Sequence, residues 1–328
     1  MKRVLVVGAG SIGLRHLRLL TEVEGFAVEV CDSRPDGLSE AAAAVPGARQ
    51  WGDFQEAAAS RPDMVFVCTP PGSHAALTRI ALESGAHVFC EKPISDSAAG
   101  ARSMIRDQQR TDRLLNVGFV QRFMPEMLRA RKLIRDGRIG RVCYARFSVA
   151  TLNTLQNSRS RHQRDVFGSA ALDYVYGFDT FWWLMRERPV SVYARGIQVE
   201  GLPFTSRPNL LSAVIEYESE RVAELHIDYV AYPDRCTYTF QGDLGYVRVD
   251  LSRNMVEHGD RETGRRYVEN LSVDRDDVMR DQRDHFLDAL EGRHPVSSPP
   301  QDALHGTLGV DALIRSLRTG RPEPLEAG

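Results

Sequence analysis

A glycine-rich turn between an apolar strand and a helix restricts the possible folds of this chain more than any other feature. The run Arg3–Val7 predicts a buried strand, the residues GAGSIG follow it, and apolar residues continue at helical spacing to Leu20. Glycines let the backbone approach a pyrophosphate, which the N-terminus of the following helix stabilises. We therefore predict a dinucleotide site whose pyrophosphate loop consists of Gly8, Gly10, Ser11, Ile12 and Gly13.

The adenosine end of this cofactor site is predicted from the residues that close the next strand. Phe26–Cys31 is apolar enough for a strand, and Asp32 follows it, nineteen residues after Gly13. A carboxylate at this position accepts hydrogen bonds from the ribose hydroxyls and repels a 2′-phosphate, which favours NAD. Ser33 and Arg34 leave NADP open, since an arginine beside a small hydroxyl residue can hold that phosphate. The alternative for Arg34 is a solvated loop charge.

Two further loops follow predicted buried strands of the same sheet. Strand Asp63–Cys68 leads into a rigid corner, and the segment Ala86–Pro93 (AHVFCEKP) ends its strand with an acid, a lysine and a proline. Ligands bind beyond the carboxyl ends of parallel strands, so these loops should line the nicotinamide pocket and place the Lys92 ammonium beside it. The predicted lining residues are Thr69, Pro70, Pro71, Glu91 and Lys92, with His74 either a cofactor contact or a structural residue at a helix entry.

Composition excludes several classes of function. With 42% hydrophobic and 26% charged residues in 328, the chain has the make-up of a globular protein, and a formal net charge of −2 gives no general attraction to nucleic acid or to an anionic membrane. No run approaches the roughly 18 apolar residues of a membrane helix, and glycines stand where a signal peptide would be cleaved, so we expect a cytoplasmic protein. The five cysteines are widely spaced and no HExxH motif occurs, so we expect no metal site.

Three motifs in this order resemble the glucose–fructose oxidoreductase / inositol dehydrogenase / MocA (Gfo/Idh/MocA) oxidoreductase family: GAGSIG, CTPPGSH and EKP. The similarity runs through nearly the whole chain. It implies an α/β protein with an N-terminal Rossmann dinucleotide-binding domain and a C-terminal α/β domain that contains a large open, mainly antiparallel sheet. It also implies NAD or NADP as the cofactor and a sugar, cyclitol or sugar nucleotide as the substrate. Lys92 is implied to bind the substrate hydroxyl and to assist proton transfer.

The second half of the chain agrees with such a domain. Six strand-like runs alternate with turn signals between Pro189 and Ser272. We place a Rossmann NAD(P)-binding domain at residues 1–120 and a substrate-binding and oligomerisation domain at 121–328, with closing helices at 276–290 and 303–317 that pack on the second domain. A sheet covered on one face and free on the other usually pairs with a second subunit, so we expect a homodimer or homotetramer through the open face.

The stretch Gly168–Met185 carries the substrate residues that the resemblance implies. Asp173 and Tyr176 are separated by three residues, which places them near one face of a single helix. Family members have a histidine at the position of Tyr176, and that histidine is implied to shuttle the hydroxyl proton. Three alternatives follow: Tyr176 takes this role with its pKa lowered by a nearby ammonium, Lys92 acts without it, or the proton chemistry is impaired.

Two arginines are further candidates for substrate binding. Arg122 matches an Arg-Phe/Tyr step of the family, although Val120 stands where many members have Asn or Gln; it either clamps a hydroxyl-rich or anionic substrate or ties the two domains together. Arg164 lies in a polar, basic stretch over Thr151–Arg164, which is either a lid over an anionic sugar or a solvated loop.

The sequence therefore predicts an NAD(P)-dependent oxidoreductase in which Lys92, Tyr176 and Asp173 handle the proton while a hydride moves between the substrate carbon and the nicotinamide. A second hypothesis is an NAD-dependent glycosidase that works by transient oxidation of the sugar. A third is a non-catalytic dinucleotide-binding sensor or assembly subunit, which the changes at Tyr176 and Val120 motivate.

Overall fold

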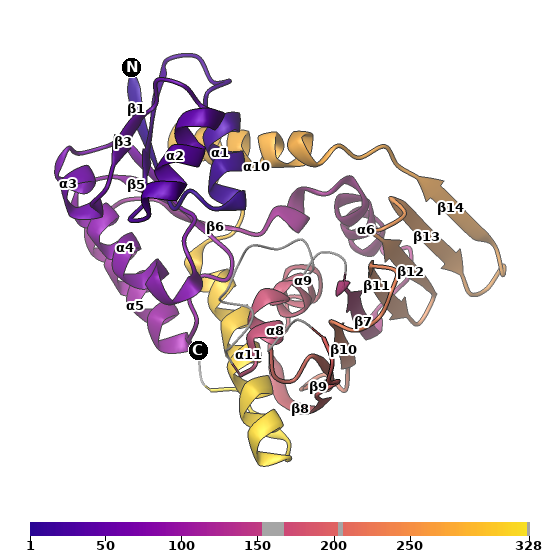
Figure 1. Ribbon diagram of the computed structural model, residues 1–328. Coiled ribbons are helices and arrows are strands. Elements are labelled where there is room, and N and C mark those ends of the chain that lie inside the picture. The colour runs from indigo at the N-terminus through magenta and orange to yellow at the C-terminus, as the bar shows by residue number, and fades with distance from the viewer. Residues whose placement is uncertain (153–166, 203–205, 327–328) are drawn as a thin grey trace. The chain divides into compact units, whose positions relative to one another are not determined.

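The computed structural model describes residues 1–152, 167–202 and 206–326. These residues divide into two compact units (Figure 1). The first comprises Met1–Val120 and Arg275–Leu304, and the second comprises Gln121–Asp274 and His305–Gly328. No helix in the described part of the chain is both long and apolar enough to cross a membrane.

The first unit is built on a parallel sheet of six strands in the order β3-β2-β1-β4-β5-β6. From the central pair β1 and β4, the strand order runs outward to β2 and β3 on one side and to β5 and β6 on the other. This is the doubly wound order of dinucleotide-binding folds. The central strands are continuously apolar because both faces of the sheet are covered. The strands are β1 (Lys2–Val7), β2 (Phe26–Cys31), β3 (Arg49–Trp51), β4 (Met64–Val67), β5 (His87–Glu91) and β6 (Leu115–Gly118). The Rossmann fold expected from the sequence is confirmed.

Helices cover this sheet, and a buried core lies between them and the strands. Val4, Val6, Phe66 and Phe89 of the sheet pack with Leu17 of α1 in one apolar cluster. The helices are α1 (Ser11–Leu20), α2 (Pro35–Ala44), α3 (Phe54–Ala59), α4 (Pro71–Glu83) and α5 (Ala98–Thr111), joined by α10 (Arg275–Leu290) from far along the chain.

The place of α10 corrects an expectation from the sequence. We expected the helix at 276–290 to close on the second domain, but α10 packs on the first unit, where Phe286 joins the core cluster. Arg283 of α10 donates to the carbonyl of Leu19, and Arg280 forms an ion pair with Glu22. The helix is drawn to the first unit because its apolar side completes that core.

The second unit is built on a nine-stranded sheet in the order β14-β13-β12-β11-β7-β10-β9-β8-β15. Within this sheet, β7 and β10 are the one parallel pair among the described strands and all other pairs are antiparallel, which confirms the expected large, mainly antiparallel sheet. The strands are β7 (Val142–Ala150), β8 (Pro189–Ile197), β9 (Leu210–Tyr217), β10 (Val222–Asp228), β11 (Arg235–Gly242), β12 (Gly245–Asp250), β13 (Met255–Asp260), β14 (Arg266–Asn270) and β15 (Glu323–Pro324).

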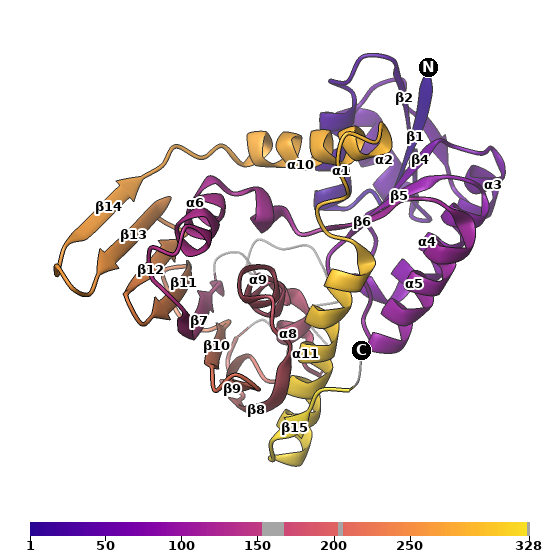
Figure 2. The same ribbon diagram turned by 180° about the vertical axis from the view of Figure 1, so that it is seen from behind.

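Helices pack on one face of this sheet, with α6 against β12 and β13 and α9 against β7 (Figure 2). They are the short 3-10 helix η1 (Val120–Phe123), α6 (Pro125–Arg135), α8 (Ser169–Asp173), α9 (Tyr176–Met185) and α11 (Pro300–Thr319). Close helix packing depends on glycine: a Cβ at Gly309 of α11 would lie 2.3 Å from the ring of Phe178 in α9.

Candidate functional site

The pyrophosphate loop of the first unit has the backbone that a dinucleotide requires. A Cβ on Gly8, at φ +95°, would lie 2.8 Å from the carbonyl oxygen of Cys68, and one on Gly13 would overlap the carbonyl of Gly8. A Cβ on Gly10 would instead meet nothing within 4 Å, so the loop is open on that side. Gly10 is also the N-cap of α1, and no side chain caps the helix there. Its N-terminus therefore offers backbone donors to a phosphate.

Asp32 lies directly after β2 and is engaged from two sides. Its Oδ2 accepts the backbone N–H of Ala9 at 2.7 Å, which ties the acid to the glycine-rich loop, and its Oδ1 accepts the backbone N–H of Arg34 at 2.8 Å. The guanidinium of Arg34 reaches both oxygens as well. Burial alone raises the pKa of Asp32, but the hydrogen bonds from Arg34 and Ala9 outweigh it and hold the pKa below its ordinary value. The carboxylate is therefore ionised at neutral pH.

The loops after β4 and β5 are joined by His74. This side chain is fully buried, with Nδ1 2.9 Å from the carbonyl oxygen of Pro93 and Nε2 2.7 Å from that of Thr69. Burial lowers the pKa of His74. Because both ring nitrogens lie against backbone carbonyls and the side chain is buried, the geometry of His74 agrees with the structural alternative, in which the residue holds the two loops together. Thr69 and Pro71 remain half-exposed at the loop surface.

Glu91 is in contact with a histidine of α1, the helix that follows the glycine-rich loop. Its Oε1 lies 2.8 Å from Nε2 of His16 in α1, and its Oε2 accepts the backbone N–H of Lys92 at 3.2 Å. His16 is itself buried against the rings of Phe66 and Phe89. The acid of the EKP motif therefore links α1 to the residue that carries the candidate ammonium, and Lys92 follows it half-exposed at the end of β5.

In the second unit, Arg122 is paired rather than available. Its Nε and Nη2 donate to the two carboxylate oxygens of Asp179 in α9 at 3.1 and 2.6 Å, and both side chains are buried. A buried guanidinium that donates two hydrogen bonds to a buried carboxylate is held in one orientation. The pair joins η1 to α9 within the second unit, so the structure gives Arg122 a structural contact, and its role as a substrate clamp stays a prediction.

The stretch from Gly168 forms two helices, not one. Tyr174 and Val175 interrupt it, so Asp173 ends α8 and Tyr176 begins α9, and the expected single helical face is wrong. Asp173 accepts a hydrogen bond from the buried hydroxyl of Tyr229 at 3.2 Å. Tyr176 is half-buried at the first residue of α9.

A glycine beside Tyr176 sets how closely α9 approaches the sheet. A Cβ on Gly177 would come within 2.8 Å of the ring of Phe147 and 2.7 Å of Leu225. Thr180, one turn further, donates to the hydroxyl of Tyr238 at 3.4 Å. The N-terminal turn of α9 is therefore seated on β7, β10 and β11.

Sequence reasoning missed residues that hold the candidate groups in place. His16, Tyr229 and Asp179 are not among the site residues that the sequence predicts. Spacing gave a signal for His16 alone, since it lies three residues after Gly13 on the same helix. The candidate Arg164 lies outside the described residues.

Comparison with protein families gives matches over both units. The model of the oxidoreductase family with an NAD-binding Rossmann fold (GFO/IDH/MocA) matches residues 2–119, and that of the GFO/IDH/MocA C-terminal domain matches residues 127–248. An inositol 2-dehydrogenase of Rhizobium meliloti is 26% identical over 328 residues, which cover 96% of this chain and 97% of that protein.

Two solved structures show how far the fold is shared. An oxidoreductase from Agrobacterium radiobacter, in complex with NAD+, L-tartaric acid and magnesium, superimposes with a TM-score of 0.86 at 18% identity and covers 99% of this chain and 98% of its own. The WlbA dehydrogenase from Bordetella pertussis, in complex with NADH and UDP-GlcNAcA, gives a TM-score of 0.84 at 21% identity and covers 100% and 98%. At these identities the likenesses establish the fold.

Proposed function

Because this chain belongs to the GFO/IDH/MocA oxidoreductase family, whose Rossmann domain binds NAD, we propose that it is a dehydrogenase or reductase that transfers a hydride between nicotinamide and a hydroxyl-bearing carbon of a sugar, cyclitol or sugar nucleotide. One observation carries the proposal: the first unit combines an open pyrophosphate loop, an ionised acid at the ribose position and Lys92 at the end of β5. The inositol 2-dehydrogenases among its relatives, and the dehydrogenase solved with NADH and UDP-GlcNAcA, support this substrate class.

The proposed chemistry divides between cofactor and protein. NAD supplies the hydride acceptor or donor when bound. Oxidation of a C–H and O–H pair to a carbonyl also releases a proton, and the protein must take it. Lys92 binds the substrate hydroxyl and orients it, Tyr176 in its deprotonated form accepts the proton at its oxygen, and Asp173 accepts a hydrogen bond from a neighbouring hydroxyl. Tyr229 holds the Asp173 carboxylate in the orientation for this contact.

The test is turnover by Lys92→Ala across a panel of myo-inositol, free sugars and UDP-sugars, followed at 340 nm. We expect the wild-type chain to form NADH with at least one of them, and the variant to lose turnover while it still binds NAD. Lys132→Ala is the matched control, because Lys132 is exposed on α6 and its ammonium forms an ion pair with Asp136 one turn further along the same helix. Normal turnover by Lys92→Ala would contradict the role of the lysine. Release of an aglycone without net NADH would indicate the glycosidase reaction instead.

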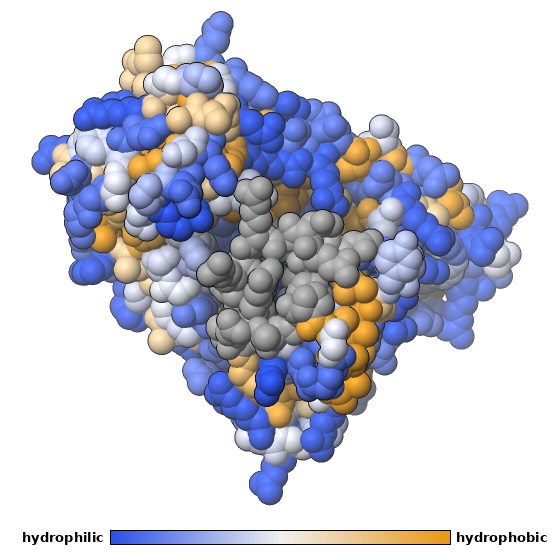
Figure 3. Space-filling model, viewed as in Figure 1, coloured by the Kyte–Doolittle hydropathy of each residue, from blue (hydrophilic) through white to orange (hydrophobic). Residues whose placement is uncertain are grey.

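We also propose that one face of the second unit's sheet, which no helix in the described part of the chain covers, pairs with a second copy of this chain. Four consecutive partners on neighbouring strands form one row across the sheet: Tyr193, Val214, Glu224 and Arg146. Glu224 is half-buried and the other three are exposed. Figure 3 shows hydrophobic residues gathered around β9 and β10. A face that mixes exposed apolar side chains with charges of both signs is suited to a self-complementary interface.

A further inference from the structure

The ribose corner of the first unit contains a contact that the cofactor must break. Asp32 has two carboxylate oxygens, and one backbone N–H is bound to each: Ala9 N–H to Oδ2 and Arg34 N–H to Oδ1. The Arg34 guanidinium takes one further position on each oxygen, with Nη2 3.1 Å from Oδ2 and Nε 3.2 Å from Oδ1. A carboxylate accepts about four hydrogen bonds, so the carboxylate has no position left for a ribose.

The positions that the guanidinium occupies are the ones that a ribose would use. The backbone N–H of Ala9 belongs to the glycine-rich loop, and that of Arg34 to the N-cap of α2. Both donors stay in place when the Arg34 side chain moves. Withdrawal of the guanidinium opens one acceptor position on each oxygen of Asp32. A ribose diol has two hydroxyl donors on neighbouring carbons. These two hydroxyls can replace the Nε and Nη2 donors of Arg34 on the two oxygens of Asp32.

The residues around Arg34 leave room for its contact with Asp32 and also leave the guanidinium exposed to solvent. Gly37 of α2 is needed for the pair, because a Cβ there would lie 2.8 Å from Asp32 Oδ2 and 3.1 Å from Arg34 Nη2. The Arg34 side chain nevertheless keeps 64% of its surface exposed. A guanidinium this exposed stays largely hydrated, so its withdrawal from the buried Asp32 returns it to water with little change in its own solvation.

The charges around Arg34 disfavour a 2′-phosphate. Besides Asp32, the carboxylates of Asp36 and Glu40 on α2 attract this guanidinium. One arginine therefore faces three carboxylates, and a phosphate brought to it would meet a negative field. NADP also lacks the 2′-hydroxyl donor that one oxygen of Asp32 would accept.

We propose that Arg34 is a latch on the adenosine-ribose subsite: its guanidinium closes the Asp32 carboxylate in the free protein, the ribose diol of NAD displaces it, and the surrounding carboxylates keep NADP out. Arg34 thus determines how tightly NAD binds without serving as a phosphate ligand. This inference rests on the proposed function for its use of NAD.

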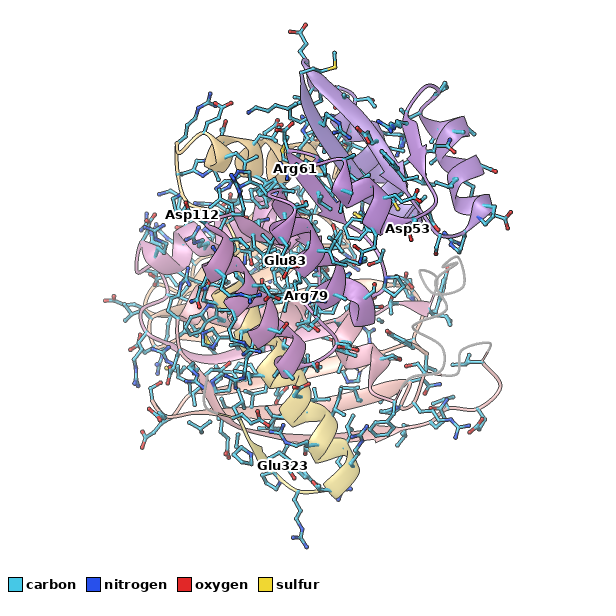
Figure 4. The ribbon with its side chains drawn as sticks, turned by 90° about the vertical axis from the view of Figure 1, so that its left-hand side faces the viewer. Asp53, Arg61, Arg79, Glu83, Asp112 and Glu323 are labelled. Atoms are coloured by element: carbon cyan, nitrogen blue, oxygen red, sulfur yellow. The ribbon has the colours of Figure 1, made fainter. Side chains whose placement is uncertain are left out.

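The experiment measures dissociation constants of NAD and NADP by calorimetry for the wild-type chain, Arg34→Ala and Arg34→Lys. We expect Arg34→Ala to bind NAD up to about fivefold more tightly, because the competing contact is gone, with the gain shrinking as salt screens that contact in the wild-type chain. Arg34→Lys should lie between the two, since an ammonium cannot bridge both oxygens as a guanidinium does. Arg79→Ala is the control, because Arg79 projects from α4 on another part of this unit and is exposed (Figure 4).

A second variant tests the selectivity by itself. Asp36→Asn/Glu40→Gln should strengthen NADP binding and leave NAD binding unchanged. An NAD affinity that Arg34→Ala leaves unchanged or weakens would overturn the latch. A tenfold or greater loss of NADP affinity in Arg34→Ala, or no gain in the double variant, would overturn the exclusion of NADP. If the wild-type chain binds no NAD, the proposed function itself fails, whereas NAD binding that ignores Arg34 contradicts only this inference.

Discussion

Glu126, the second residue of α6, is a buried carboxylate, and neither of its oxygens has a hydrogen-bond partner among the described residues. Burial therefore raises the pKa of Glu126. Above the ordinary pKa of about 4.5, the unfolded chain has lost this proton while the folded chain still holds it. The contribution of Glu126 to the free energy of unfolding therefore falls as pH rises from 4.5 through the raised pKa, and stays low above it.

Replacing Glu126 by Gln should consequently stabilise the protein at neutral pH. We expect a gain in the free energy of unfolding at pH 7, because a glutamine has no charge to desolvate, and no gain near pH 4, where the buried carboxyl of Glu126 is already neutral. Urea denaturation at both pH values measures this. The control is Glu22→Gln, where hydrogen bonds, first from Arg280, lower the pKa of Glu22 to about 2, so removing the charge destabilises at pH 7. A destabilised Glu126→Gln at pH 7 would contradict the prediction.

Tyr176 is the proposed proton acceptor, and Tyr174 is a neighbouring tyrosine that serves for comparison. Tyr176→Phe should lower kcat by about 10²–10⁴-fold with little change in KM, because only the proton-accepting oxygen is removed. Tyr174→Phe removes a hydroxyl that donates to Thr151 at 2.8 Å, and should keep kcat. Stopped-flow measurement of NADH formation across pH distinguishes them. An unchanged kcat in Tyr176→Phe would leave Lys92 as the acting group.

At the scale of elements, α10 is the clearest case of a segment whose role depends on distant residues. Phe286 lies 5.9 Å from the ring of Phe66 and 5.7 Å from that of Phe89, edge to face with both. The two partner strands, β4 and β5, are the ones whose following loops carry Thr69 and Lys92. The helix α10 therefore packs against the two strands of the parallel sheet that lead into these loops.

Phe286→Ala should lower the free energy of unfolding of the first unit by about 3–5 kcal/mol, since it opens a cavity in a packed core. Thermal unfolding followed by circular dichroism measures the loss. Asp281→Ala, an exposed change on the same helix, should stay within about 0.5 kcal/mol of the wild-type value. If both variants unfold alike, α10 does not support this core.

At the scale of the whole molecule, one face of the nine-stranded sheet has apolar side chains that remain exposed. Its uncovered face keeps Val214 at 41% and Tyr193 at 36% exposure, and pairs Arg146 with Glu224 at 3.6 Å on adjacent strands. Such apolar exposure on a flat sheet is stabilised when a second copy covers it.

Val214→Asp should therefore convert the assembly of this chain to monomer, because it buries an unpaired carboxylate at the centre of the interface. Analytical ultracentrifugation over a range of concentrations measures the change. Leu128→Asp is the control: Leu128 is 44% exposed, but lies on α6, on the covered side of the sheet. A wild-type chain that sediments as a monomer would contradict the proposed interface.

Local patterns determined the cofactor half of this protein. The glycine loop, Asp32 after β2 and Lys92 after β5 follow from strand ends and turn residues a few positions apart, and a parallel sheet brings such ends to one edge. Period-two alternation likewise predicted the antiparallel strands of the second unit. These features depend on neighbours in the sequence, which is why they could be predicted.

Only the tertiary structure decided which of these groups are available and which are already bound. The pairs Arg122–Asp179 and His16–Glu91 join residues 57 and 75 positions apart, and Tyr229 reaches Asp173 across 56. Whether an arginine or histidine is a ligand or a support depends on such partners, which no local spacing reveals. For the same reason α10, with its core partners some 200 residues earlier, could be recognised as a helix but not assigned to its unit.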